Sequence, residues 1–231
     1  MAERLEDPAL AGLYPFLAGN RQDSQALDRA LLESVRQKAD ESVEVKRRFF
    51  AESGVTIVAA ARAIAAVYRQ GGRLYTMGNG GSSCDAAHIA VEFQHPITAG
   101  RPALAAINLA NDCATLTAVG NDVGFQHVFL RQVGAHVRAG DGVIGVSTSG
   151  NSENLLLAFT AAKARGAVTI GLAGGDGGRM FGHPDVDHCL VVPTDSIHRV
   201  QETHVALYHI LWDLTHTLLA DDRGPSATKG T

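Results

Sequence analysis

Short apolar runs recur along the chain from about residue 73 onward. The first four are separated by stretches that can form helices. Continuous apolar strands that alternate with helices are typical of a parallel sheet buried on both faces. We therefore expect a doubly wound α/β fold with a five-stranded, flavodoxin-like parallel sheet. The predicted strands are RLYTMGN (73–79), ALAAINL (103–109), GVIGVST (142–148), VTIGLAG (168–174) and HCLVVPT (188–194).

A helical extension is predicted ahead of the first strand. From about Gln25 to Glu52, apolar residues recur at helical spacing among charged ones. An Ala-rich segment follows, with Ser53 as a candidate N-cap and two glycines as a stop signal. This pattern predicts two antiparallel helices, or one broken helix, within residues 26–72.

The chain closes with one more predicted helix over residues 196–220, followed by a polar segment. Residues 1–25 and 221–231 lack clear periodicity, which predicts a loosely ordered lead-in and a flexible tail. A chain of 231 residues is long enough for one sizeable core. We therefore expect a single domain over 26–220.

Composition narrows the possible partners. The formal net charge is −4, and the basic residues are scattered apart from one run at 46–48, so neither nucleic acid nor a polyanion is an expected ligand. The N-terminus lacks the order of a signal peptide, and no uncharged stretch is long enough to span a bilayer. An odd number of well-separated cysteines, without a CxxC pair, indicates reduced thiols in a cytoplasmic protein: Cys84, Cys113 and Cys189.

Two strand ends share a composition of Gly, Ser and Asn. The first predicted strand leads into GNGGSS (78–83), and the third into STSGNS (147–152). Glycines let the backbone approach an oxyanion, while hydroxyls and helix N-terminal amides donate hydrogen bonds to it. Neither loop contains Lys or Arg, which disfavours a nucleoside triphosphate and favours a single phosphate monoester. The alternative is that these residues only form turns and N-caps.

Four polar residues on two predicted helices form a second pattern. His88 and Glu92 lie four residues apart and therefore share a helix face. On the final helix, Gln201 and His209 differ by eight residues, an offset of roughly 80° at ~100° per residue, so both can face one cleft. This set of ligands suits Zn²⁺ or a similar divalent ion. A packed histidine is the alternative, and spacing alone does not favour His88 and His209 over His204.

Five segments together carry a resemblance to a known family: GNGGSSCDAAH, AVGNDVGF, STSGNSEN, GGDGGRM and RVQETHVALYH. They resemble motifs of the sedoheptulose-7-phosphate isomerases, a family of the sugar isomerase (SIS) superfamily. The resemblance runs in order from about Leu32 to Leu218. It implies an aldose–ketose isomerase that makes D-glycero-D-manno-heptose 7-phosphate from sedoheptulose 7-phosphate through an enediol.

The resemblance also implies roles for individual residues. Glu92 would be the general base and His209 the general acid. One divalent ion per subunit, Zn²⁺ or another, would be held by His88, Glu92, Gln201 and His209. Phosphate contacts would fall on Ser147, Ser149 and Ser152, with Thr148 beside them. Sugar contacts would fall on Asn79, Gly80, Gly81, Ser82, Asn111, Asp112 and Gln201, with Glu92 also facing the substrate. The family forms homotetramers with active sites shared between subunits.

Two positions depart from the family pattern. Where the family has Thr-Gly-Arg and an aromatic residue, this chain has Gln94-His95-Pro96-Ile97, and Pro96 also predicts a helix end near His95. His198 stands where an acidic or small residue is usual. Neither Pro nor His reproduces the bidentate contacts of Arg, so an isomerase of a different phosphosugar is an alternative.

A protein without catalysis is the other alternative: a sugar-phosphate sensor, or a tetramer that binds the replication initiator. GNGGS together with His88, Glu92, Gln201 and His209 favours the enzyme.

Overall fold

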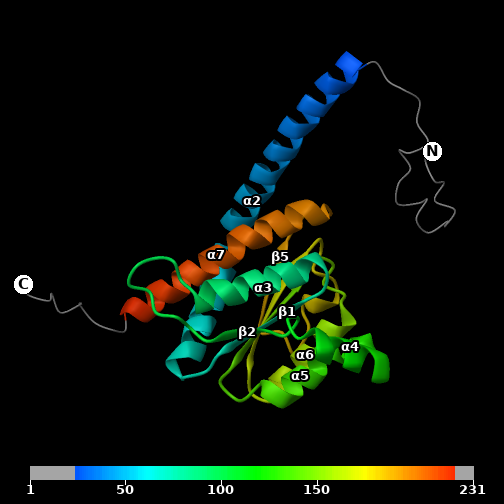
Figure 1. Ribbon diagram of the computed structural model, residues 1–231. Coiled ribbons are helices and arrows are strands. Elements are labelled where there is room, and N and C mark those ends of the chain that lie inside the picture. The colour runs from blue at the N-terminus through cyan, green and yellow to red at the C-terminus, as the bar shows by residue number, and fades with distance from the viewer. Residues whose placement is uncertain (1–23, 222–231) are drawn as a thin grey trace, which may run out of the picture. The chain divides into compact units, whose positions relative to one another are not determined.

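The computed structural model describes residues 24–221, and within that range five strands form one parallel sheet (Figure 1). The order β2-β1-β3-β4-β5 is that of a doubly wound, flavodoxin-like fold, as predicted. The strands are β1 (Leu74–Gly78), β2 (Ala106–Asn108), β3 (Gly142–Ser147), β4 (Val168–Gly174) and β5 (His188–Val192).

β2 is much shorter than the apolar run that predicted it. The backbone N–H of Leu104 donates to the carbonyl of Phe93, 2.8 Å away, so this part of the run is held by the end of a helix. Strand pairing with β1 covers only Ala106 to Asn108. β1 and β3, by contrast, are buried along their whole length at the centre of the sheet.

Helices connect the strands and cover both faces of the sheet. One core cluster packs the later part of α2 (Ser24–Arg69), α3 and α7 against the sheet, and the other packs α5 and α6 against the opposite face. The loop from β4 to β5 contains a short 3₁₀ turn, Gly178–Met180. The remaining helices are α3 (Gly81–Gln94), α4 (Cys113–Asp122), α5 (Val128–His136), α6 (Glu153–Lys163) and α7 (Ile197–Asp221).

The prediction of two helices, or of a broken one, ahead of β1 is wrong, because α2 runs unbroken from Ser24 to Arg69. Ser53 lies inside the helix. Its neighbour Gly54 costs roughly 1 kcal/mol relative to Ala. Burial of the face from Phe49 to Val67 outweighs that cost, since each fully buried aliphatic or aromatic side chain contributes about 1.5–3 kcal/mol.

The chain forms two compact units, divided between Asp40 and Glu41 within α2. In the first unit, the described part of the helix exposes Leu27, Leu31 and Val35. By length and composition alone α2 could cross a membrane, a test that core helices of soluble proteins also pass. In the second unit, Phe49, Ile57 and Ile64 of α2 are buried in the core, whereas Val55 is exposed.

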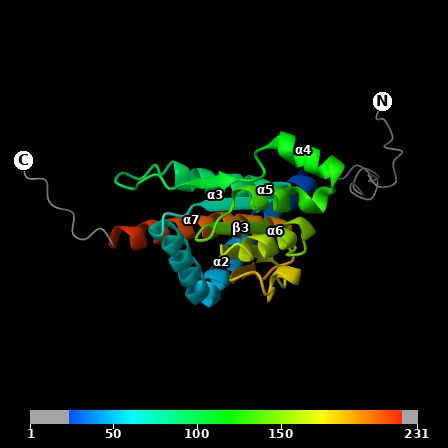
Figure 2. The same ribbon diagram turned by 90° about the horizontal axis from the view of Figure 1, so that it is seen from below.

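The predicted lead-in over 1–25 and the predicted tail over 221–231 lie almost entirely outside the described residues. The predicted final helix corresponds to α7. Its neighbour α3 lies beside it and runs along the same face of the sheet (Figures 1 and 2).

Candidate active site

The two helices α3 and α7 run parallel and in register. The Tyr208 hydroxyl hydrogen-bonds His88 Nδ1 at 2.7 Å, and Trp212 Nε1–H donates to the backbone carbonyl of Glu92 at 2.8 Å. Both pairs are separated by 120 residues. Each turn of α3 therefore faces the matching turn of α7, and residues on the two facing stripes meet in pairs.

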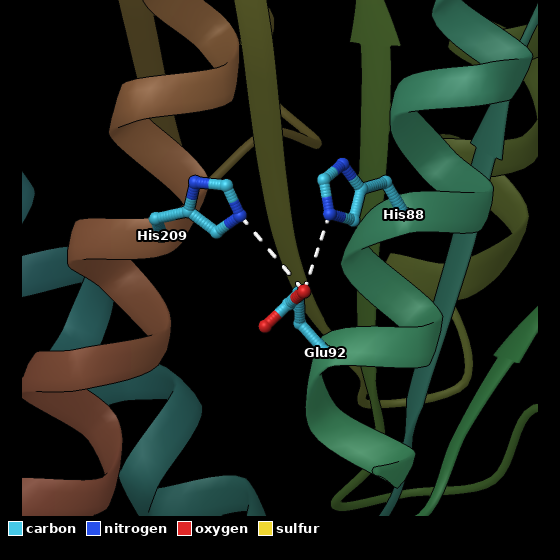
Figure 3. A group of neighbouring side chains, drawn as sticks. All are labelled: His88, Glu92 and His209. Atoms are coloured by element: carbon cyan, nitrogen blue, oxygen red, sulfur yellow. Dashed lines mark hydrogen bonds and ion pairs between the residues drawn. The ribbon is translucent and has the colours of Figure 1, made fainter. Parts of the chain in front are cut away.

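Three of the four predicted metal ligands meet between these helices. Glu92 Oε1 lies 3.2 Å from His88 Nε2 and 3.9 Å from His209 Nε2 (Figure 3). The two imidazole rings are 5.0 Å apart between centroids. All three side chains are partly exposed, at 41% for His88, 26% for Glu92 and 43% for His209. The cluster is thus anchored in the fold but open to a ligand.

The donor set of this cluster fits a divalent ion. One ligand atom from each residue lies within 4.8 Å of the others. Two imidazoles and one carboxylate are typical of Zn²⁺ sites with three protein ligands and an open position.

The fourth predicted ligand, Gln201, lies two turns before His209 on α7, beside the start of α3. A Cβ added to Gly81 would approach Gln201 Nε2 to 2.3 Å. Glycine at position 81 is therefore what lets the Gln201 amide approach the first loop.

The first and third loops are tied together by a pair of amides. Asn79 and Asn154 exchange two hydrogen bonds of 2.9 Å between their side chains. Asn154 is buried on the first turn of α6. Sequence reasoning did not identify it; the signal was a polar residue directly ahead of a leucine run. Because of this link, the predicted sugar loop and the predicted phosphate loop form one continuous edge of the site.

The third loop gathers three hydroxyls at the N-terminus of α6. Ser147 Oγ lies 2.9 Å from Ser152 Oγ and 3.5 Å from Ser149 Oγ. Ser152 is the N-cap of α6, yet its side chain makes no capping hydrogen bond. Gly150 has φ of +64° and packs against the Gly177 carbonyl, where a Cβ would come within 1.9 Å. Hydroxyls and free amides at a helix N-terminus are a suitable phosphate cradle.

A cavity of about 390 Å³ borders this loop on the side of α7. Thr148 and Ser149 line it, but so do the carboxylates of Asp176 and Asp195. Those carboxylates repel an anion, so the hydroxyl cluster is the better place for a phosphate. Arg179, which the sequence analysis did not single out, donates its backbone N–H to Asn151 Oδ1 at 3.0 Å and pairs with Glu153.

Two predicted sugar contacts also have structural tasks. Asp112 is the N-cap of α4, and its carboxylate accepts from Thr115 N at 3.0 Å and Thr115 Oγ1 at 2.6 Å, which lowers the pKa of Asp112. Asn111 Oδ1 accepts from Asn108 Nδ2 at 2.8 Å. Both residues still line a cavity of about 410 Å³ next to β2.

The chain is similar in sequence and in structure to known proteins. Residues 39–174 match the SIS domain family. The phosphoheptose isomerase of Chlorobium phaeovibrioides is 46% identical over 181 residues, which cover 77% of this chain and 84% of that protein. The chain belongs to the phosphoheptose isomerase family. A second relative, the phosphoheptose isomerase of Chlorobaculum tepidum, is 43% identical to this chain. The match covers 88% of this chain and 94% of that protein. A solved phosphoheptose isomerase from Neisseria gonorrhoeae has a TM-score of 0.76 and 39% identity, covering 81% of this chain and 99% of that one.

The C-terminal end of α3 lies next to Pro96, one of the two positions at which the sequence departs from the expected family pattern. α3 ends at Gln94, as Pro96 predicts. In a continuing helix the Glu92 carbonyl would accept the N–H of residue 96, which proline lacks. Trp212 Nε1–H takes that place at 2.8 Å. The Arg101 guanidinium lies 4.4 Å from the centroid of the Trp212 ring, so a cation–π contact also helps to hold the indole in place.

The structure also distinguishes among the histidines of this isomerase. His204 is fully buried, and its Nε2 lies 3.0 Å from the carbonyl of Ala173 on β4. It faces the sheet and not the cluster. Burial lowers the pKa of His204 to about 4. His95 and His198 are exposed.

Asp85 is a further residue that sequence reasoning missed. It lies on α3 one turn before His88 and is buried, and burial raises its pKa to about 6. Among the described residues its Oδ2 has no hydrogen-bond partner. Its spacing of three from His88 was the available signal, but only the position of α7 shows that it is buried beside the site.

Proposed function

We propose that this protein converts sedoheptulose 7-phosphate to D-glycero-D-manno-heptose 7-phosphate. The observation that carries the proposal is the cluster of His88, Glu92 and His209 on α3 and α7. With it goes a serine-rich loop at the N-terminus of α6, tied to the loop before α3 by the Asn79–Asn154 hydrogen bonds. The first offers acid–base groups for a carbonyl, and the second offers donors for a phosphate. Relatives that share up to 46% identity carry the name phosphoheptose isomerase.

Glu92 and His209 are suited to the two proton transfers of this reaction. Glu92 would take a proton from C1, next to the ketose carbonyl, while His209 gives a proton to the oxygen on C2. The product of this step is a 1,2-enediol. Glu92 then returns its proton to C2, and His209 takes the proton of the C1 hydroxyl as the aldehyde forms. Both groups end in their starting state.

A divalent ion, with Zn²⁺ as the first candidate, would be held by His88, Glu92, Gln201 and His209. When bound, it would polarise the carbonyl and hydroxyl oxygens of the substrate.

Most of the remaining substrate contacts would come from the loops at 78–83 and 147–152. The phosphate would be bound by Ser147, Thr148, Ser149 and Ser152. Sugar hydroxyls would meet Asn79, Gly80, Gly81, Ser82, Asn111, Asp112 and Gln201. The carboxylate of Glu92 would lie against the reacting carbons.

We also infer a homotetramer whose active sites are shared between subunits. In the single chain the side chains of His88 and His209 are more than 40% exposed, which leaves room for a second chain to complete the site. Val55 and Val58 on α2 are exposed as well. Light scattering on the purified protein tests this proposal, and a mass of one chain would contradict it.

The decisive experiment is an assay of the Zn²⁺-loaded protein with sedoheptulose 7-phosphate, with product detected by NMR. Glu92→Gln and His209→Ala should each lose at least a hundredfold in kcat, because general acid–base groups contribute roughly 10²–10⁴-fold. Tyr75→Phe, which loses only a hydroxyl bonded to the His136 carbonyl, is the matched control. Full turnover in both site variants would disprove the acid–base assignment.

A different phosphosugar is the second candidate, favoured by Pro96 and His198 at two positions near the site. The same assay with other ketose and aldose phosphates distinguishes the two proposals. A kcat/KM higher for another sugar than for sedoheptulose 7-phosphate would replace the first candidate.

A further inference from the structure

The unassigned contact at the centre of the site is the one between Tyr208 and His88. Tyr208 is 2% exposed, and its hydroxyl lies 2.7 Å from His88 Nδ1. His88 uses its other nitrogen, Nε2, toward Glu92 (Figure 3). The two nitrogens of His88 are therefore engaged from opposite sides, by a carboxylate on its own helix and by a hydroxyl from α7.

The partners of His88 determine where its proton lies. In a neutral imidazole one nitrogen donates and the other accepts, and the carboxylate of Glu92 only accepts. The hydrogen bond to Glu92 Oε1 therefore favours the tautomer with its proton on Nε2. Nδ1 is then the acceptor, and the Tyr208 hydroxyl donates to it. A phenol has an ordinary pKa of roughly 10, so at neutral pH it holds a proton and can donate this hydrogen bond.

A cation at Nε2 would require the opposite tautomer. Nδ1 would then carry the proton and donate to the Tyr208 oxygen, because only a deprotonated imidazole nitrogen ligates a metal. A hydroxyl serves either tautomer, since it both donates and accepts.

We propose that Tyr208 is a positioning residue that fixes the ring of His88 and accommodates both of its tautomers. This inference deepens the proposed function and rests on it for the role of His88. Tyr208 touches neither the substrate nor the reacting atoms, and it acts through His88. A phenylalanine at position 208 would keep the edge-to-face packing on His88, whose ring centroid lies 5.1 Å away, and would lose only the hydroxyl.

The test compares Tyr208→Phe with the Tyr75→Phe control. Zn²⁺ affinity of the metal-free proteins is measured by competition with a chelator. Tyr208→Phe should bind Zn²⁺ roughly 10–100-fold more weakly, the usual effect of removing a partner of a metal-ligating histidine, while Tyr75→Phe should match the wild type. Equal affinity in all three proteins, or equal loss in both variants, would overturn the proposal.

NMR spectroscopy tests the proposal on the wild-type protein itself, so the result does not depend on whether Tyr208→Phe folds. In ¹⁵N-histidine NMR spectra, with His88 assigned from a His88→Gln sample, metal-free protein should show His88 protonated at Nε2. Added Zn²⁺ should move the proton to Nδ1. A His88 that already carries its proton on Nδ1 without metal contradicts the proposal. Neither measurement uses substrate, so absence of turnover would refute the proposed function and leave the Tyr208 result standing.

Discussion

At the scale of single residues, burial decides which of several similar side chains belongs to the site. His204, Tyr208 and His209 are close neighbours on α7. His204 faces the sheet with its Nε2 on a strand carbonyl, whereas His209 lies 3.9 Å from Glu92. The fully buried histidine is kept neutral, whereas His209 is 43% exposed and lies in the cluster with His88 and Glu92.

The buried His204 predicts a pH dependence of stability. Its pKa is lowered to about 4 in the folded state from an ordinary 6.5, so between these values the unfolded chain binds more protons. The free energy of unfolding should therefore fall as pH falls from 6.5 to 4, by an amount on the order of 3 kcal/mol if fully expressed. His204→Gln, whose amide can still donate to the Ala173 carbonyl, should lose this part of the slope in urea titrations at pH 4.5 and 7.

Asp85 changes the free energy of unfolding with pH in the opposite direction, over nearly the same pH range. Its folded pKa of about 6 lies above the ordinary 3.8, so its contribution to stability is complete below 3.8 and declines as pH rises through 6. Asp85 is present in both the wild type and His204→Gln, so its contribution cancels in the difference between their free energies of unfolding. An unchanged slope in His204→Gln would show that His204 is not the titrating group.

At the scale of elements, the end of α3 depends on a side chain from α7. Pro96 removes one hydrogen bond from the helix, and Trp212 supplies it from 120 residues away. The indole thereby fixes the turn that carries Glu92. The register of the two helices is thus set by specific hydrogen bonds as well as by apolar packing.

This pairing predicts a compensating pair of substitutions. Trp212→Phe leaves the Glu92 carbonyl without its donor and should lower the free energy of unfolding by about 1–3 kcal/mol, with loss of ring packing adding to this. Adding Pro96→Ala should recover part of the loss, because residue 96 regains an N–H. Urea denaturation of the two single variants and the double variant measures the coupling. Strict additivity of the two effects would contradict this account.

At the scale of the whole molecule, the parallel sheet places α3, which follows its first strand in the chain, beside α7, which follows its last. His88 and Glu92 come from α3, directly after β1, and His209 comes from α7, after the last strand. The two serine- and glycine-rich loops meet at the carboxyl edge of β1 and β3. Residues that follow the first strand and residues that follow the last strand therefore lie together in one cluster.

A cation between α3 and α7 would also link these two helices. We therefore expect a change in stability on metal removal. Chelation of Zn²⁺-loaded protein should lower its melting temperature, because a ligand that binds only the folded state stabilises it. At a free Zn²⁺ concentration one hundred times Kd the effect is about 2.7 kcal/mol. Scanning calorimetry measures it, and Glu92→Gln should show a smaller difference. No shift in the wild type would refute a metal at this cluster.

The sequence by itself determined what lies within single elements. The five apolar runs predicted the parallel sheet, Pro96 predicted the end of α3, and spacing of four placed His88 and Glu92 on one face, because helix and strand geometry fix short spacings. The motif resemblance indicated the family.

Tertiary structure decided what depends on packing between elements. Nothing local distinguishes His209 from His204, or reveals that Asp85, Tyr208 and Trp212 surround the site, because the register of α3 against α7 is set where both pack on the sheet. The continuity of α2 across Ser53 has the same origin, since burial on both sides of that residue outweighs its local preference for a helix start.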